Sequence, residues 1–308
     1  MAGLAMTRMR GAAIVLAMLI AALAAAVAAT VFADQQRWIR TVEHRRDQVQ
    51  AQALAMAGVQ WTRQILDDDA RRSEIDHLGE PWALTLPPIP LEDGEVRGAI
   101  VDAQGRLNIN ALGTADASAE QERVRLTRLF AQRGIPPAAL AGMSDWIDTD
   151  SVVRESGGED AFYLAQPVPR LAANAPVLRV AELGLVKGVT PRALAAVLPF
   201  LSALPAGTPV NVNTAPREVL AAILGNIGGE RLEALVADRA RKPFTTIAEF
   251  RSRLPDGASL ASDAALSVKS NYFYVTIEAR QGATLSHARA LVRRGGGGKP
   301  EIVWQVVE

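Results

Sequence analysis

The sequence predicts an α+β fold in which one long N-terminal helix packs on an antiparallel sheet, with a large α-helical domain inserted into that sheet. Three observations predict it. A charge-free apolar run near the N-terminus continues into a helical pattern that contains no proline. Strand patterns occur in two places far apart, before residue 110 and after residue 270. Helix-start signals crowd the stretch between them.

The composition restricts the function classes to which the chain can belong. Its 308 residues carry 33 basic and 33 acidic side chains, so the formal net charge is zero. Nucleic-acid-binding proteins usually carry a basic excess. The absence of cysteine excludes disulfides and cysteine-based metal sites. The three histidines lie far apart and lack a zinc-type spacing: His44, His77 and His287.

The first element is a candidate membrane-spanning helix over residues 12–33. Neither charge nor proline interrupts Ala12 to Phe32, while Arg8 and Arg10 precede this run and Asp34 follows it. Twenty-odd helical residues at about 1.5 Å each span roughly 30 Å, the thickness of a hydrocarbon core. The basic residues before the run predict a cytoplasmic N-terminus. A cleavable signal peptide and a plain signal anchor are the alternatives.

The helix is expected to continue beyond the membrane. Residues 34–66 contain no proline and a single glycine, Gly58, and apolar side chains recur among polar ones with an imperfect helical period. The run Asp67-Asp68-Asp69 is expected to mark the end of the helix.

Two separated segments carry strand patterns. Residues 79–94 are rich in glycine and proline and predict a loop. Strands over 95–101 and 106–109, joined by a turn, then predict a hairpin. Apolar and polar residues alternate over 272–279, which indicates a strand buried on one face. Two more strands are expected over 284–293 and 301–307.

The region between these segments carries helix-start signals. Ser118 and Gln121 form a capping box for a helix that ends at Gly134. Thr190-Pro191 and Thr214-Ala-Pro216 each start another helix, and Thr246 with Glu249 forms a second capping box. Four asparagines at strand ends or turns are expected to tie loops to the backbone through their amides: Asn108, Asn110, Asn211 and Asn213.

The N-terminal junction resembles the leader of the type IV pilin superfamily. A short basic segment ends in Gly11 and is followed directly by the apolar helix. The resemblance implies that prepilin peptidase removes residues 1–11 by cutting after Gly11, and that Ala12 becomes N-methylated. Most members have glutamate at the fifth mature position, where this chain has Leu16. That departure resembles the K-type minor pseudopilins of type II secretion systems.

Six further motifs resemble the K-type family and occur in the family order. They lie at residues 102–110, 145–150, 157–163, 174–176, 180–183 and 210–215. The resemblance implies a type IV pilin-like fold with three parts after the membrane span. Residues 34–111 form the rest of the long helix and the first strands, residues 112–270 form an inserted helical domain of helix-hairpin-helix or SAM-like type, and residues 271–308 form the C-terminal strands.

The same resemblance implies a function and a location. The chain would be a non-enzymatic subunit at the tip of the pseudopilus, initiating or capping assembly with I- and J-type subunits for protein export across the outer membrane. It would be single-pass in the bacterial inner membrane, contact the inner-membrane secretion platform, and have its soluble domain in the periplasm.

An acidic stretch is a candidate calcium site. Asp145 precedes five further acids with the glycine pair 157–158 among them: Asp148, Asp150, Glu155, Glu159 and Asp160. Calcium takes six to eight oxygen ligands, several of them carboxylate. The spacing is not that of an EF-hand. K-type relatives bind calcium, so the resemblance implies a structural calcium ion here, and a solvated acidic loop is the alternative.

Two other function classes have weaker support in the sequence. Residues 210–254 resemble a helix-hairpin-helix module, as in membrane-anchored DNA-binding receptors, but their charges sum to only +2. An enzyme would need a catalytic motif. The run from Gly295 to Lys299 is followed by proline instead of serine or threonine, and no G-x-S-x-G sequence occurs.

Overall fold

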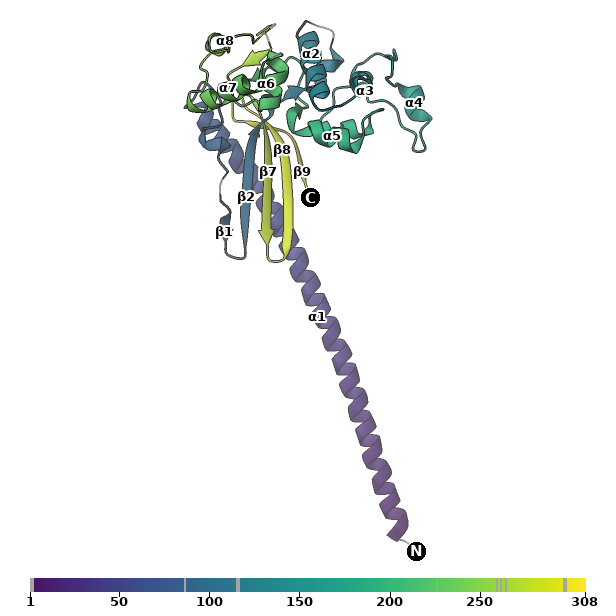
Figure 1. Cartoon of the computed structure of the whole chain (residues 1–308). Coiled ribbons are helices and arrows are strands. Elements are labelled where there is room, and N and C mark those ends of the chain that lie inside the picture. Colours follow the sequence, from purple (N-terminus) through teal and green to yellow (C-terminus); the bar gives the residue numbers. More distant parts are fainter. Residues whose placement is uncertain are drawn as a thin grey trace.

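The chain folds into a helical head above an antiparallel sheet, with one helix extending away from both as a stalk (Figure 1). The structure, a computed structural model, describes residues 3–308 except 86, 115, 116, 226, 259, 261, 264, 296 and 297. For residues 3–11, 117 and 118 it describes the backbone only.

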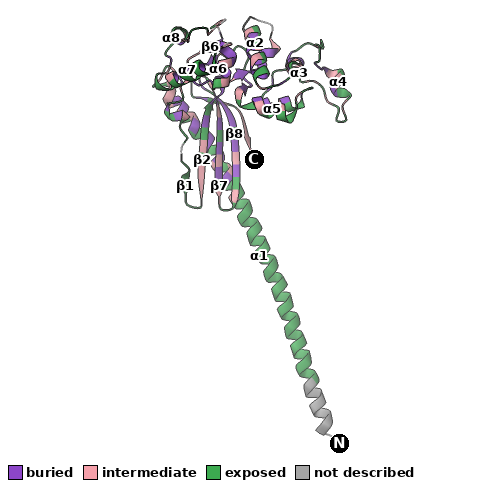
Figure 2. Ribbon diagram, in the orientation of Figure 1, coloured by how far each residue is buried: buried purple, intermediate pink, exposed green. Residues whose placement is uncertain are grey.

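Helix α1 runs from Gly3 to Ala70 and forms both the stalk and one layer of the body. Side chains from residue 12 to residue 46 are exposed, and a buried stripe begins at Ala51 (Figure 2). The stripe recurs every three or four residues at Ala51, Ala55, Val59, Thr62 and Leu66, which is the period of one helix face. The continuous helix and its end beside the Asp67–Asp69 run confirm the predictions for this segment.

The sheet has five strands in the order β1-β2-β7-β8-β9, and every neighbouring pair is antiparallel. The strands are β1 (Ile89–Leu91), β2 (Gly94–Asp102), β7 (Tyr272–Gln281), β8 (Thr284–Arg293) and β9 (Glu301–Val307). Phe273, Val275, Ile277 and Ala279 of β7 are buried against α1, which confirms the predicted alternation. The last two strands also have the predicted bounds.

Two predictions about the first β segment are wrong. The expected loop at 79–94 contains strand β1 and a short helix, η1 (Pro81–Ala83). The expected hairpin does not form, because β2 pairs with β1 and β7, whereas β3 (Leu107–Asn108) pairs in parallel with β4 (Leu201–Ser202). The chain leaves the sheet at Asp102 and enters the head.

The head consists of two units with a common plan. Each has near its start a short strand that ends in the first asparagine of an Asn-x-Asn sequence, and each closes with a parallel partner strand: β3 with β4, and β5 (Val210–Asn211) with β6 (Leu266–Ser267). In both, the first asparagine Oδ1 accepts from the backbone N–H of the second. The first unit holds η2 (Ala103–Gly105), η3 (Ile109–Gly113), α2 (Ala117–Gln132), α3 (Pro137–Ile147), α4 (Asp160–Leu164), η4 (Val180–Leu185), α5 (Pro191–Val197) and η5 (Leu198–Phe200). The second holds α6 (Arg217–Leu224), α7 (Gly229–Arg241) and α8 (Ile247–Ser252).

The predicted helix starts have different outcomes. Thr190 and Thr246 each accept a hydrogen bond from an amide of the first turn, which confirms both as N-caps. The reciprocal half of the predicted capping box does not form, because the Glu249 carboxylate accepts from Thr245. The Ser118 side chain lies outside the described atoms. The expected cap at Thr214 is wrong: α6 begins three residues later, and the Thr214 hydroxyl donates to Asp102 instead. The head core begins with Leu107 and Ile109, before residue 112.

Candidate functional site

The acidic stretch forms an irregular loop between α3 and α4 in the head. Asp145 lies in the last turn of α3 and is fully buried. Its carboxylate accepts from the Arg154 backbone N–H at 3.1 Å and from the Arg154 guanidinium at 2.9 Å. A Cβ at Gly157 would collide with this carboxylate, so the loop can close over Asp145 only with glycine there.

Three of the acids come together at the open side of this loop. One carboxylate oxygen from each of Asp148, Asp150 and Glu159 lies within 4.8 Å of the others. Asp148 and Glu159 are buried, and Asp150 is exposed. Oδ1 of Asp148 and both carboxylate oxygens of Glu159 are buried without a hydrogen-bond partner. Buried carboxylate oxygens normally have partners, so this donor set fits a hard divalent cation.

Burial, together with the negative charges of Asp145, Asp148 and Asp150, raises the pKa of Glu159 to about 7. Burial also raises the pKa of Asp148, against the hydrogen bond and charge of Arg154. A bound cation would reverse this penalty, since an opposite charge favours the ionised carboxylates.

Two of the sequence-predicted ligands lie outside this group. Two basic residues that contact the loop were not predicted from the sequence. Glu155 is exposed, and Asp160 Oδ1 accepts from the Ala172 backbone N–H at 2.8 Å. Arg154 pairs with both Asp145 and Asp148, and the Lys187 ammonium donates to the Gly157 carbonyl. The position of Arg154 inside the acidic run was the available signal for an internal counter-ion.

The four asparagines hold the fold, as predicted. Asn110 Nδ2 donates to the Val177 and Leu204 carbonyls, and Asn213 exchanges two hydrogen bonds with the Phe244 backbone. Asn108 Nδ2 donates to the Pro205 carbonyl. Asn211 belongs to a larger network around Asp102.

A buried polar network joins the head to the sheet. The Asp102 carboxylate accepts from the Gln104 N–H, Asn211 Nδ2, Thr214 Oγ1 and Ser270 Oγ. The Ser270 backbone N–H donates to the Asp76 carboxylate, and the Ser270 carbonyl accepts from the Arg294 guanidinium. Burial raises the pKa of Asp102 to about 6, even though the hydrogen bonds that its carboxylate accepts lower the pKa. This network ties the end of β2 to Asn211, Thr214 and Ser270, which are more than 100 residues away in sequence, so we assign it a structural role.

The seven cations in the segment that resembles a DNA-binding module are engaged within the head. Five of the seven pair with carboxylates: Arg217, Arg241, Lys242, Arg251 and Arg253. Arg239 is buried and donates to two backbone carbonyls, and Arg231 donates to the Asp256 carbonyl. Few charges are therefore free for phosphates.

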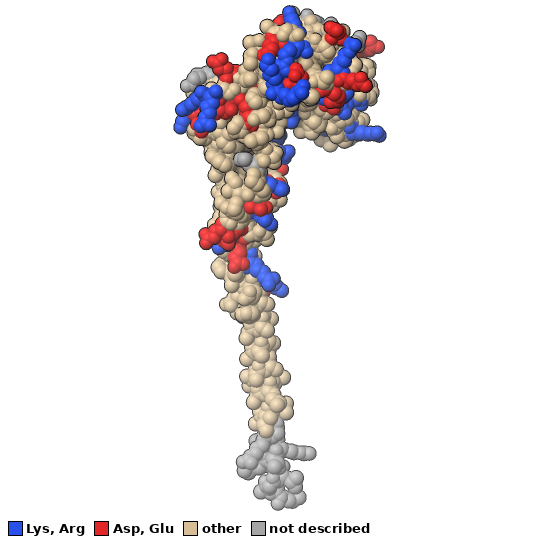
Figure 3. Space-filling view, turned by 60° about the vertical axis from the view of Figure 1, so that its left-hand side comes forward, with Lys and Arg blue, Asp and Glu red and all other residues tan. Residues whose placement is uncertain are grey.

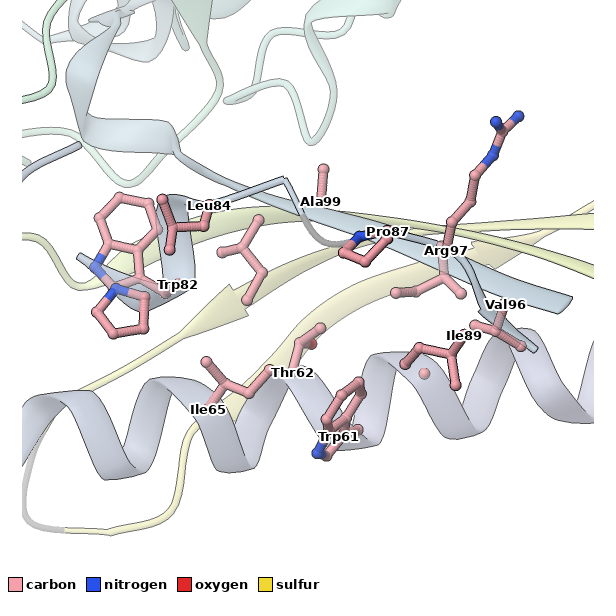
Figure 4. A pocket seen from close by; sticks show the side chains of 15 residues that line it. Trp61, Thr62, Ile65, Trp82, Leu84, Pro87, Ile89, Val96, Arg97 and Ala99 are labelled. Carbon is pink, nitrogen blue, oxygen red and sulfur yellow. The ribbon is translucent and has the colours of Figure 1, made fainter. Parts of the chain in front are cut away.

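A small apolar pocket of about 50 Å³ lies between α1 and the β1–β2 edge (Figure 4). Trp61 and Ile65 of α1 face Trp82 and Ile89 across it. Its lining offers packing surface and no cluster of reactive groups.

The stalk carries the features of a membrane anchor. The α1 segment beginning at Ala12 is long and apolar enough to cross a membrane, by length and composition. In the space-filling view this part of the stalk has no charged side chain (Figure 3). The backbone is helical through Gly11 and Ala12, whereas the side chains before Ala12 lie outside the described atoms.

A long helix with an apolar projecting half, packed by its other half on an antiparallel sheet, defines a pilin-like filament subunit. The family described as type II secretion system (T2SS), protein K matches residues 105–206 and 210–269. A type II secretion system protein K from Pseudomonas aeruginosa is 32% identical over 305 residues, covering 95% of this chain and 91% of the relative. One from Pectobacterium carotovorum is 30% identical and covers 94% of each chain.

A solved structure shares the fold. The crystal structure of the GspK-GspI-GspJ complex from the enterotoxigenic Escherichia coli type 2 secretion system contains a chain that matches with a TM-score of 0.70 and 24% identity. The match covers 89% of this chain and 98% of that chain. The chain belongs to the type II secretion system protein K family, and it is a minor pseudopilin. The DNA-receptor alternative has no support among these relatives.

Proposed function

We propose that this minor pseudopilin occupies the tip of the pseudopilus, where it initiates or caps assembly with I- and J-type subunits for protein export across the outer membrane. The position and the breadth of the head are the observations that support this proposal. It stands above the sheet at the end of α1 farthest from the N-terminus and spreads sideways beyond the sheet (Figure 1). A subunit stacked above it would meet this head. The matching solved structure is, by its title, a GspK-GspI-GspJ complex.

The topology proposed for this chain has α1 crossing the inner membrane once. Arg8 and Arg10 favour a cytoplasmic N-terminus, which puts the sheet and head in the periplasm and the base of α1 near the inner-membrane secretion platform. Small side chains in the span let sibling helices approach closely. Assembly of one copy each of the three subunits needs no cofactor beyond the structural ion considered below.

The test of the proposal is assembly with tagged sibling subunits. The full chain, co-expressed with I- and J-type subunits and extracted in mild detergent, is expected to co-purify with both in equal amounts. A gold label on the head of assembled filaments is expected at one end. An even distribution of label along the shaft, or no association with either sibling, contradicts the proposal.

We also propose processing by prepilin peptidase after Gly11 and methylation of Ala12. A basic leader that ends in glycine and meets the apolar helix directly supports this. Co-expression with the peptidase is expected to shorten the chain by the eleven leader residues and to add one methyl group, both measured by intact-mass spectrometry. Gly11→Val is expected to block the cut. Cleavage between Ala24 and Ala33 instead would identify an ordinary signal sequence.

The acidic loop is proposed to hold a structural calcium ion. Asp148, Asp150 and Glu159 would be the carboxylate ligands, supported by their mutual distances and by the unpartnered buried oxygens. Three carboxylates supply at most six oxygens, which is near the calcium requirement. The ion would neutralise the clustered charge and so stabilise the loop between α3 and α4.

A further inference from the structure

The outer face of the sheet, opposite α1, is divided into two unlike halves. Far from the head it is polar, with cross-strand ion pairs between Arg97 and Glu278 and between Arg280 and Glu95. Next to the head the register brings apolar and aromatic side chains into rows on the same face: Val101, Tyr274, Leu291, Trp304 and Val306. A solvent-facing antiparallel sheet is usually polar on its outer side, so this apolar half is unusual.

The head provides a second apolar wall above this half. Leu185 of η4 and Leu198 of η5 face the sheet, and their side chains are 50% and 40% exposed. The two walls enclose a cleft of about 590 Å³, within the range of sites that bind small molecules or peptide side chains. In Figure 1 part of the head overhangs the β9 edge of the sheet. The residues that line the cleft come from the head and from the sheet.

The cleft contains a cation that has no ion-pair partner among the described residues. Arg106 lines it, with its guanidinium 5.3 Å from the centre of the Tyr274 ring. Burial lowers the pKa of Arg106, against the attraction of Tyr274 and Asp102. The Asp102 oxygens already accept four hydrogen bonds from other groups. Trp304, which also lines the cleft, has its Nε1 buried without a partner.

These groups define the chemistry of an occupant. A half-buried guanidinium is satisfied best by a carboxylate, which accepts two of its N–H groups. The aromatic and aliphatic part of the lining favours apolar side chains beside that carboxylate. The other charged residues that line the cleft are Arg179, Glu182 and Arg289, of which Arg289 pairs with Glu308. β9 is an edge strand of the described sheet, so an extended segment can lie beside it and under the overhang.

We propose that this cleft receives a segment of a sibling I- or J-type pseudopilin in which one Asp or Glu, flanked by apolar residues, pairs with Arg106. This rests on the proposed function. Subunits whose N-terminal helices run in parallel place a sibling's globular domain beside this sheet and below this head. The underside of the head, with its cleft, then faces that sibling.

The experiment measures sibling binding by the full chain and its variants in detergent micelles. Arg106→Ala and the exposed-wall variant Leu185→Asp are expected to reduce the amount of co-purified sibling at least about tenfold, the effect of unpairing a desolvated charge. Arg106→Lys is expected to retain part of the binding. The matched control is Arg97→Ala, which removes an arginine from the polar half of the same face. Thermal melting checks that each variant is folded.

A photo-crosslinker at Leu185 identifies what lies in the cleft. A crosslink to an acidic, apolar segment of the I- or J-type subunit supports the proposal. If the unmodified chain binds its siblings and both cleft variants bind them equally well, the cleft assignment is wrong while the proposed function stands. A crosslink to a secreted protein or to a second copy also overturns it. If the unmodified chain binds neither sibling, the proposed function itself fails.

Discussion

Glu159 is the side chain on which the chemistry of the acidic loop depends. It is buried at the start of α4, makes no capping hydrogen bond, and has two unpartnered oxygens. Its pKa of about 7 means that it holds a proton over much of the range in which an unfolded glutamate is ionised. Proton and cation therefore compete for the same carboxylate, and folding stability becomes sensitive to both.

The first prediction concerns this competition in metal-stripped protein. A carboxyl group with a raised folded-state pKa contributes stability that is fully present below pH 4.5 and is lost as pH rises to about 7. The melting temperature of the metal-free chain is expected to fall across this window. Calcium is expected to raise it strongly at pH 7.5 and little at pH 5, because the ion binds the ionised form.

Two variants separate this effect from other titrations. Glu159→Gln cannot titrate, so its metal-free melting curve is expected to change less with pH, even though Asp102 still titrates near pH 6. Asp148→Ala combined with Asp150→Ala is expected to abolish the calcium response. Scanning calorimetry measures both. A calcium response that survives all three substitutions would show that calcium binds outside this loop, and an unmodified chain whose melting curve does not respond to chelator would leave only a solvated loop.

At the scale of elements, the close contact between α1 and the sheet depends on two glycines, which have no side chain. Gly58 lies on the buried face of α1, and a Cβ there would come within 2.7 Å of Ile277 Cγ2. A Cβ at Gly98 of β2 would come within 2.6 Å of Ile277 Cδ1. Both glycines make room for one isoleucine, which brings the helix close to β7.

The second prediction is a reversal of the usual effect of glycine replacement. Alanine normally stabilises a helix interior by about 1 kcal/mol relative to glycine, whereas overpacking a core costs about 1–3 kcal/mol. Gly58→Ala is expected to lower the free energy of unfolding by about 1 kcal/mol. In an Ile277→Ala background the same change is expected to be neutral or stabilising. Chemical denaturation of the four proteins measures this coupling, and equal effects in both backgrounds would refute it.

The elements that the sequence predicted best are those with one buried face. β7 to β9 and α1 carry periodic patterns because each packs one side on the same core. The hairpin prediction failed because a two-residue strand has no period, and its partner β4 lies more than 90 residues away. The repeated Asn-x-Asn sequences at 108–110 and 211–213 were a visible signal of the two-unit head.

The acidic site was predictable only in part for a related reason. The clustered acidic residues identified this segment as a candidate site. Which of their carboxylates converge depends on the path of the chain around Asp145. Arg154 holds that path through its backbone N–H and guanidinium. Spacing in the sequence alone does not contain this information.

At the scale of the whole molecule, the head is an insertion between two paired strands. β2 and β7 are antiparallel neighbours, and Asp102 stands opposite Phe273 in their register. The whole head thus takes the place of a hairpin turn. It is fastened there by the Asp102 network and by a small cluster in which Ala103 and Leu204 pack on Leu291.

The last prediction tests whether this insertion or the missing glutamate confines the subunit to the tip. Replacing residues 103–272 with Asn-Gly joins Asp102 to Phe273 through a two-residue turn that suits adjacent antiparallel strands. The headless chain is expected to keep its sheet, measured by circular dichroism, and to melt at a lower temperature because the Asp102 network is lost. Label on its sheet is expected along the whole shaft of assembled filaments.

The matched variant Leu16→Glu keeps the head and introduces the glutamate that most type IV pilin-like proteins have at this position. It is expected to stay at the tip, because the head still obstructs the next subunit. Headless protein found only at filament ends, with Leu16→Glu spread along the shaft, would assign the restriction to the helix instead.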